Sequence, residues 1–170
     1  MSVTGTSVRR ALCPGSYDPV TAGHVDIIRR AAAIYDEVVV AVLHNPAKHG
    51  TFAVEERIAF IEEETADLEG VRAQAFANRL LVDVCRDVDA TVILKGLRGG
   101  TDFAYEMPMA LMNRHLTGIE TVFLPGDPTL EHVSSSLVKE VARFGGDVTG
   151  LVSDRVRGEV VARRTRPGPP

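Results

Sequence analysis

The chain has 170 residues, of which 45% are hydrophobic and 25% are charged, and its formal net charge at pH 7 is -4. This length and composition are typical of one soluble globular domain that buries its core without disulfides. The negative net charge argues against a general nucleic-acid binder, and no apolar run approaches the ~20 residues that a membrane-spanning helix needs.

The cysteines and the first residues bear on the cellular compartment. Cys13 and Cys85 stand in unrelated contexts and have neither metal-ligand spacing nor the pattern of a disulfide framework, which suits a reducing cytosol. Arg9 and Arg10 are not followed by a long apolar stretch, so we expect no signal peptide. These features together predict a cytoplasmic protein.

Predicted strands and helices alternate along the chain. Apolar and β-branched runs predict strands at residues 8–13, 37–43, 71–76, 90–94 and 121–124. Segments of helical period predict helices at residues 22–35, 54–67, 78–87, 101–116, 135–144 and 154–164. This alternation indicates a parallel sheet with right-handed crossovers. The expected fold is α/β: a Rossmann-like, doubly wound, five-stranded parallel sheet flanked by helices in one domain.

Prolines and glycines refine these boundaries. Pro108 lies inside the fourth predicted helix and predicts a kink there, and the pair Gly145-Gly146 predicts the end of the fifth helix. We expect one domain across residues 1–170, ordered from about residue 8 to 165. The basic, Pro/Gly-rich end predicts a flexible tail at residues 166–170, and its short length disfavours the alternative of an RNA-binding tail.

The stretch PGSYDPVTAGHVDIIRRA joins the first predicted strand to the first helix. Pro14 and Gly15 predict a sharp turn off the strand, with the hydroxyl of Ser16 facing the same space. Thr21 fits a helix N-cap whose hydroxyl accepts from a backbone amide two or three residues on. His24 then lies in the first turn, where free amides and the helix dipole form an anion site. We interpret the stretch as a phosphate cradle with a histidine donor; a surface histidine on a capped helix is the alternative.

Two further motifs place cations after predicted strands. Lys48 follows the second strand in HNPAKHG and could meet a phosphate as a point charge, although loop lysines are usually only solvated. KGLRGG follows the fourth strand, and its Lys95 and Arg98, interleaved with glycines, suit a polyphosphate lying against backbone amides. A basic turn that serves solubility is the alternative for the second motif.

A run of three serines precedes the fifth predicted helix in HVSSSLVKEVA. Ser134, Ser135 and Ser136 supply three hydroxyls beside the free amides of a helix start, which is a second candidate anion site. Because one serine serves as the cap, at least one hydroxyl is left for a ligand.

Taken in order, these motifs resemble a known family. PGSYDPVTAGHVDIIRRA is similar to the T-x-G-H signature of the nucleotidylyltransferase superfamily. NPAKHGTFAVEERI, KGLRGGTDFAYEMPMALMNRH and VSSSLVKEVARFGGDV follow it, and together they resemble bacterial phosphopantetheine adenylyltransferase from about residue 11 to residue 152. The first motif indicates only the superfamily, whereas the last two are much more specific.

The resemblance implies a reaction and partners. The reaction is reversible transfer of the adenylyl group from ATP to 4'-phosphopantetheine, which gives dephospho-coenzyme A and pyrophosphate in coenzyme A biosynthesis. Mg²⁺ would be carried by the ATP phosphates, a homohexamer is expected, and coenzyme A is a candidate feedback ligand. The alternatives are a sibling transferase, acting on nicotinate mononucleotide or as a cytidylyltransferase, and a non-catalytic nucleotide-sensing module.

The resemblance also implies roles for individual residues. Implied catalytic residues are Ser16, His24, Lys48 and Arg98. Implied ATP-binding residues are Ser16, Tyr17, His24, Gly96, Leu97, Arg98, Glu106, Leu130, Glu131, His132, Val133, Ser134, Ser135 and Ser136. Implied contacts to the acceptor substrate are Ser16, Lys48, Leu81 and Lys95, and no residue is assigned as a metal ligand. Considered without the family, Glu106 is typical of a helix-surface acid and Leu81 of a core leucine.

The implied mechanism is in-line attack of the acceptor phosphate on the α-phosphorus of ATP. No covalent protein intermediate is required, because a phosphate is already a nucleophile near neutral pH, and the protein aligns the reactants and stabilises charge. His24 and Ser16 are assigned to the α-phosphoryl group, and Lys48 to a bridge between the substrates. Since the helix dipole disfavours a charged His24 and a polyphosphate favours it, we predict that ATP raises the pKa of His24.

Overall fold

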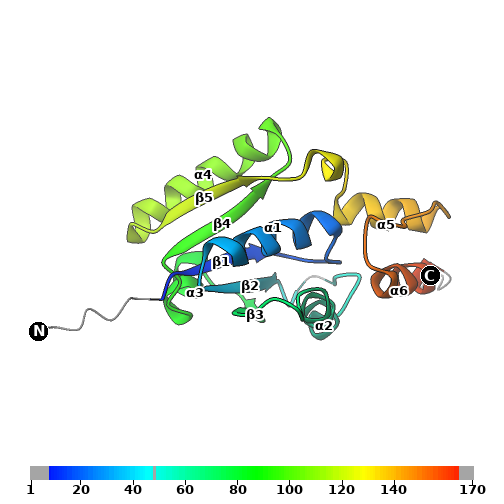
Figure 1. The fold of residues 1–170 in the computed structure, drawn as a ribbon, viewed down its shortest axis with the longest axis horizontal. Coiled ribbons are helices and arrows are strands. Elements are labelled where there is room, and N and C mark those ends of the chain that lie inside the picture. Colours follow the sequence, from blue (N-terminus) through cyan, green and yellow to red (C-terminus); the bar gives the residue numbers. More distant parts are fainter. Residues whose placement is uncertain (1–7, 48, 165–170) are drawn as a thin grey trace, which may run out of the picture.

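The computed structural model describes residues 8–47 and 49–164. Its strands are β1 (Arg10–Gly15), β2 (Glu37–His44), β3 (Val71–Ala77), β4 (Val92–Leu97) and β5 (Glu120–Pro125). Its helices are α1 (Ala22–Ile34), α2 (Val54–Glu64), α3 (Leu81–Asp87), α4 (Gly100–Thr117), the short 3₁₀ helix η1 (Pro128–Leu130), α5 (Ser135–Arg143) and α6 (Asp154–Arg164). All strands are parallel, in the order β3-β2-β1-β4-β5 (Figure 1), which confirms the predicted sheet.

The interior strand β2 is buried on both faces, as its continuous apolar run predicts. Val38, Val40 and Val42 of β2 belong to a core cluster with α1, α2, α5 and α6. Val39 and Ala41, which point to the opposite face, belong to a second cluster with α3. Every one of these β2 side chains is fully buried, so apolar residues are needed at successive positions.

The connectivity creates one switch point in the sheet. The chain runs outward from β1 through β2 to β3 and then returns past β1 to β4 and β5. In such sheets ligands bind beyond the carboxyl ends of the strands, where the strand order reverses, which here lies between β1 and β4. Pairing between β1 and β4 covers only Ala11 and Leu12 of β1, whereas pairing between β1 and β2 continues to Gly15.

The predicted turn at Pro14 and Gly15 is wrong. Both residues belong to β1 and pair with β2, and the chain turns later, where Tyr17 adopts a left-handed backbone with φ 48°. Gly15 permits this turn because a Cβ at its position would lie 3.0 Å from the Tyr17 ring. The buried Tyr17 hydroxyl donates to the Cys13 carbonyl at 2.9 Å, and this contact helps to hold the unusual backbone.

Three of the predicted helices have boundaries or interiors that depend on single residues. The third helix begins at Leu81 and not at residue 78, because Asn78 is left-handed with φ 52° and cannot start a helix. Helix α4 runs continuously from Gly100 to Thr117 with Pro108 inside it. The predicted stop of the fifth helix is confirmed, since α5 ends just before Gly145, which has φ 89°.

Two predictions fall on residues that the structure does not describe. Lys48 is one, and the flexible tail at residues 166–170, with residue 165 before it, is the other. Over the described ranges 8–47 and 49–164, no helix combines the length and the apolar character needed to cross a membrane.

Candidate active site at the carboxyl edge of the sheet

A cavity of about 360 Å³, called here the switch-point cavity, lies beyond the carboxyl ends of β1 and β4. The first turns of α1 and α4 and the segment that leads into α5 complete its wall. The predicted site residues that line it are Tyr17, His24, Lys95, Gly96, Leu97, Arg98, Glu106, Leu130, Val133, Ser134 and Ser135. Three stretches that are distant in sequence, residues 13–28, 94–106 and 126–135, therefore meet where the topology places a ligand.

The other predicted site residues that the structure describes lie elsewhere. Ser16 and Ser136 line a second cavity of about 630 Å³, which shares Ser135 with the switch-point cavity. Three further predicted residues that the structure describes line neither cavity: Leu81, Glu131 and His132. Glu131 and His132 are exposed, while Leu81 packs against the core cluster beneath α3.

His24 is oriented by the start of its own helix. Thr21 is the N-cap residue, as predicted, but its hydroxyl makes no cap hydrogen bond. Instead, Nδ1 of His24 accepts from the Thr21 backbone N–H at 3.0 Å and lies 3.0 Å from the Thr21 hydroxyl. Because Nδ1 acts as the acceptor, a neutral imidazole carries its proton on Nε2 and can donate from that atom.

The environment of His24 keeps the imidazole neutral. Burial, followed by the positive charges of Arg98 and Lys95, lowers the pKa of His24 from 6.5 to about 4. The charged form of His24 is disfavoured, as predicted, and burial and the two neighbouring cations contribute to this effect. A neutral donor is therefore available at physiological pH.

We expect ATP to raise the pKa of His24, because a bound polyphosphate stabilises the imidazolium form. The test is an NMR titration of the imidazole with and without ATP, and an unchanged pKa would contradict a phosphate contact.

Protein stability should follow the same shift. An unfolded histidine titrates near 6.5 and the folded His24 at about 4, so between these values only the unfolded chain takes up the proton. The free energy of unfolding should therefore fall as the pH drops from about 6.5 to about 4. Urea unfolding at pH 7 and pH 5 should show a smaller loss for His24→Asn than for the wild type, and an equal loss would contradict the shift.

The cations of the switch-point cavity are already paired with carboxylates from α4. Lys95 Nζ lies 3.1 Å from Glu106 Oε1. Arg98 donates to both Asp102 oxygens, at 3.0 and 3.1 Å, and to the Val133 carbonyl at 3.3 Å. The hydrogen bond from the Arg98 side chain lowers the pKa of Asp102 despite partial burial. Glu106, for which the resemblance implies an ATP contact, here balances the charge of Lys95.

The start of α5 divides its serines between different tasks. Ser134 is the N-cap and accepts from the Leu137 N–H at 3.2 Å, so the predicted capping serine is identified. Ser135 donates to the Pro19 carbonyl at 2.7 Å. Ser136 is exposed on the second cavity.

The wall of the cavity formed by β4 and α1 has no room for a larger residue at Gly96. A Cβ there would lie 2.5 Å from Ile27 Cγ1 of α1. We expect Gly96→Ala to lower the free energy of unfolding by about 1–3 kcal/mol, as overpacking does, and to weaken ATP binding. Gly100→Ala is the matched control, since a Cβ at Gly100 meets nothing within 4 Å. Urea unfolding and calorimetry with ATP should separate the variants, and equal behaviour would contradict the packing argument.

The cavity contains neither a metal cage nor a reactive thiol. Across residues 8–47 and 49–164, no group of three or more His, Cys, Asp or Glu side chains is arranged to hold a metal ion. Cys13 lines the cavity and Cys85 lies in the core, and burial raises their pKa values to about 12 and about 11. Both thiols therefore stay protonated and poorly nucleophilic.

Comparison with known proteins identifies the family. Residues 12–141 match the family model described as cytidylyltransferase-like. A protein of Nocardioides sp. named phosphopantetheine adenylyltransferase is 58% identical over 154 residues, which is 91% of this chain and 96% of that protein. A protein of the same name from Micrococcus luteus is 56% identical and covers 85% of this chain and 92% of its own length. Another from Streptomyces coelicolor is 53% identical and covers 94% of this chain and 99% of its own length. The chain belongs to the phosphopantetheine adenylyltransferase family.

Solved structures agree with this family's fold. A Vibrio parahaemolyticus protein assigned as a nicotinate-nucleotide adenylyltransferase has a TM-score of 0.67 at 14% identity, covering 94% of this chain and 97% of that chain. A lipopolysaccharide core biosynthesis protein of Thermoplasma volcanium has a TM-score of 0.52 at 22% identity, covering 71% and 97%. At these identities the likeness concerns the fold alone.

Sequence reasoning assigned no role to one polar cluster of this family member. Asp18, Arg57 and Lys139 meet beside Ser16 in the second cavity. Asp18 and Lys139 are 121 residues apart, so no local motif signals their contact.

Proposed function

We propose that this chain transfers the adenylyl group of ATP to 4'-phosphopantetheine, reversibly, which yields dephospho-coenzyme A and pyrophosphate in coenzyme A biosynthesis. The observation that carries this proposal is identity of 53–58% to three phosphopantetheine adenylyltransferases along 85–94% of the chain. The cavity at the switch point supports it, because His24, Lys95 and Arg98 converge there. The whole chain then acts as one nucleotidylyltransferase domain.

The chemistry asks the protein to position and stabilise, since the acceptor phosphate is itself the nucleophile. His24 donates from Nε2 to the α-phosphoryl oxygens, on which negative charge grows during transfer. Because the pKa of His24 is low, the imidazole stays neutral and keeps its proton on Nε2. His24 therefore acts as a hydrogen-bond donor and does not need to gain or lose a proton at each turnover. Ser16 and Lys48 are assigned to the junction between ATP and the acceptor.

The cations proposed to hold the polyphosphate are balanced by two carboxylates of α4. The pairs Lys95–Glu106 and Arg98–Asp102 leave the cavity close to neutral before a ligand binds. We assign Arg98 and the start of α5 to the β- and γ-phosphates, and Lys95 to the acceptor side. Mg²⁺ is proposed to arrive on the ATP phosphates as part of the substrate, which fits a cavity in which Glu106 and Asp102 already pair with cations.

Pyrophosphate release measured with alternative substrates tests this function. With ATP and phosphopantetheine we expect kcat/KM at least about 10²-fold above that with nicotinate mononucleotide as acceptor or CTP as donor. Turnover with nicotinate mononucleotide or CTP at the higher rate would favour a sibling transferase. ATP binding without turnover on any acceptor would favour the nucleotide-sensing module.

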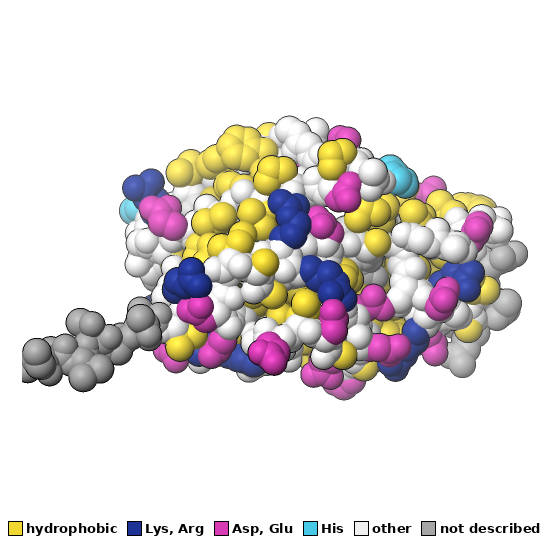
Figure 2. Space-filling model, in the orientation of Figure 1, with side chains coloured by type: hydrophobic (Ala, Val, Ile, Leu, Met, Phe, Trp, Pro, Cys, Tyr) yellow, Lys and Arg dark blue, Asp and Glu magenta, His cyan; other side chains and the backbone are white. Residues whose placement is uncertain are grey.

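An exposed apolar stripe on α4 supports the proposed homohexamer. Tyr105, Met109, Met112 and Leu116 are spaced along one face of the helix and are 82%, 54%, 52% and 50% exposed. Figure 2 shows hydrophobic side chains gathered along the upper edge of the molecule, where Figure 1 places α4 and β5. A contiguous apolar surface of this kind is typical of an interface.

The cytoplasmic location, coenzyme A as a feedback ligand and the lack of a nucleic-acid partner belong to the same proposal.

We expect charges placed in this stripe to break the assembly. Met109→Glu combined with Met112→Glu should convert the hexamer to smaller species, because buried unpaired carboxylates are costly at an interface. Light scattering coupled to size-exclusion chromatography measures the change. Val161→Glu is the control, since Val161 is an exposed apolar residue on α6, at 41%. An unchanged mass in the α4 variant would contradict the interface.

A further inference from the structure

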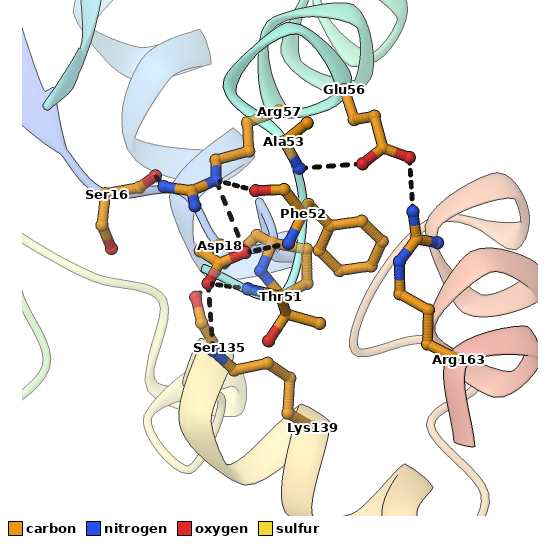
Figure 3. A network of polar contacts seen from close by, with 11 residues as sticks. Ser16, Asp18, Thr51, Phe52, Ala53, Glu56, Arg57, Ser135, Lys139 and Arg163 are labelled. Carbon is orange, nitrogen blue, oxygen red and sulfur yellow. Dashed lines mark hydrogen bonds and ion pairs between the residues drawn. The ribbon is translucent and has the colours of Figure 1, made fainter. Parts of the chain in front are cut away.

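The second cavity contains an ionic cluster that the mechanism above does not use. Asp18 comes from the β1–α1 connection, Arg57 from α2 and Lys139 from α5 (Figure 3). Ser16 and Ser136 line the same cavity, and Ser135 connects it to the switch-point cavity. The cluster therefore joins segments to which phosphate-handling roles are assigned.

Asp18 is the centre of this cluster. Its side chain is 13% exposed, and its two carboxylate oxygens accept from the backbone N–H groups of Thr51 and Phe52, each at 2.9 Å. Lys139 Nζ lies 3.3 Å from one oxygen and Arg57 Nε lies 3.4 Å from the other. Burial raises the pKa of Asp18, but the two backbone hydrogen bonds and the two cations outweigh burial and hold the pKa below its usual value.

Arg57 connects the loop before α2 to the turn that carries Ser16. The residue is only 6% exposed, and its guanidinium donates to the Phe52 carbonyl at 2.9 Å and to the Ser16 carbonyl at 3.2 Å. A Cβ at Gly50 would lie 1.7 Å from Arg57 Nη2, so the loop closes directly over the guanidinium. The Ser16 backbone and the loop thus have one shared anchor.

Helix α5 is fixed to the same turn from the other side. Lys139 reaches Asp18, and one turn earlier Ser135 donates to the carbonyl of Pro19, the residue after Asp18. In Figure 3 both side chains point from α5 toward the turn. The helix start that carries the three serines is thereby held at a fixed distance from Ser16.

Stability alone does not account for such a cluster. Well-packed apolar residues often stabilise a buried site as well as charges do, so a buried ion pair is weak evidence for a stabilising role. Positioning accounts for it better, because a displacement of about 1 Å among reacting groups can cost roughly 10²-fold in rate. Thr51, which Asp18 anchors, follows Lys48 by three residues in the sequence.

We propose that Asp18 is a positioning residue for adenylyl transfer, which sets the spacing between Ser16, the segment that follows Lys48, and the start of α5. Asp18 acts through these groups and does not touch the substrates. The proposal rests on the proposed function, and Arg57 and Lys139 are the cations that keep Asp18 in place.

Asp18→Asn tests the proposal, because an amide of the same size can accept only one of the two backbone hydrogen bonds cleanly. We expect kcat to fall roughly 30–100-fold at 20 °C, while KM for ATP changes by less than about threefold. Backbone amide hydrogen exchange at Thr51 and Phe52 should be faster than in the wild type. This measurement tests whether Asp18 anchors the loop, independently of activity. In a Ser16→Ala background, Asp18→Asn should cost at least about threefold less, because the two changes act along one route.

Asp36→Asn is the matched control. Asp36 accepts from the backbone N–H and the guanidinium of Arg9, so the substitution removes similar bonds next to the amino end of β2. It should change kcat by less than about threefold even where it lowers Tm as much as Asp18→Asn does. Should Asp18→Asn fail to fold, Lys139→Gln removes one cation and leaves both backbone bonds, and a kcat loss of about 3–10-fold is expected.

The outcomes separate the positioning role from the proposed function. Wild-type turnover with ATP and phosphopantetheine, measured first, decides the function. Equal kcat for Asp18→Asn and Asp36→Asn, unchanged exchange at Thr51 and Phe52, or full additivity with Ser16→Ala would overturn the positioning role. For Lys139→Gln, a kcat equal to that of the wild type would overturn it.

Discussion

Replacement of His24 by alanine is expected to lower kcat roughly 10²–10³-fold or more, the loss seen when a preorganised donor to a developing charge is removed. The Nε2 donor is preorganised because Nδ1 is held by the Thr21 N–H at 3.0 Å. The fold should persist, since the residue is not fully buried and its side chain satisfies one backbone amide. Steady-state kinetics, together with thermal unfolding followed by circular dichroism, measures both quantities.

His115→Ala is the control for this prediction, since His115 is an exposed histidine near the end of α4. It should leave kcat within about twofold, as surface substitutions generally do. If His24→Ala lost no more activity than His115→Ala, His24 would have no phosphate role.

Arg98→Ala is expected to lower kcat/KM for ATP by roughly 10²-fold, because charge-assisted hydrogen bonds contribute about 1.5–3 kcal/mol each and a tenfold change corresponds to about 1.4 kcal/mol. The substitution also leaves the Asp102 carboxylate without its cationic partner, although the backbone N–H of residue 98 still donates to it, in a cavity that must receive a polyphosphate. Adding Asp102→Asn to the variant removes that charge and should restore roughly tenfold of the loss.

The pair of Arg86 and Asp83 on α3 provides a control of similar geometry. Its two side chains are bound at 3.1 Å and lie outside both cavities described above. Arg86→Ala should change kcat/KM for ATP by less than about twofold. A loss for Arg98→Ala that Asp102→Asn does not relieve would show that repulsion by the orphaned carboxylate is unimportant.

The sequence predicts correctly those parts of the fold that depend on the local pattern of hydrophobic residues. The unbroken apolar run of β2 predicts a strand covered on both faces, and its valines are fully buried. The boundaries that failed depend on single backbone conformations. Asn78 and Tyr17 both adopt a left-handed backbone that non-glycine residues seldom adopt. As a result, α3 begins later than predicted, and the first turn comes after Gly15.

The candidate site likewise contains residues that local sequence features predict and contacts that they do not predict. His24 and Arg98 could be found because each is marked by a local feature, a helix start in one case and a strand end in the other. The surroundings of these residues depend on the fold: Asp102, four residues after Arg98, neutralises it at the start of α4, and burial followed by the charges of Arg98 and Lys95 lowers the pKa of His24. The Asp18 cluster had no sequence signal, since its members are brought together only by the folding of three distant segments.

The most direct test of the central claim is a crystal structure with a non-hydrolysable ATP analogue and Mg²⁺. We predict that the triphosphate lies across the carboxyl ends of β1 and β4, with an α-phosphoryl oxygen within hydrogen-bond distance of His24 Nε2 and the outer phosphates at Arg98 and the start of α5. A nucleotide bound away from the switch-point cavity, or bound there with His24 turned from the α-phosphate, would contradict it.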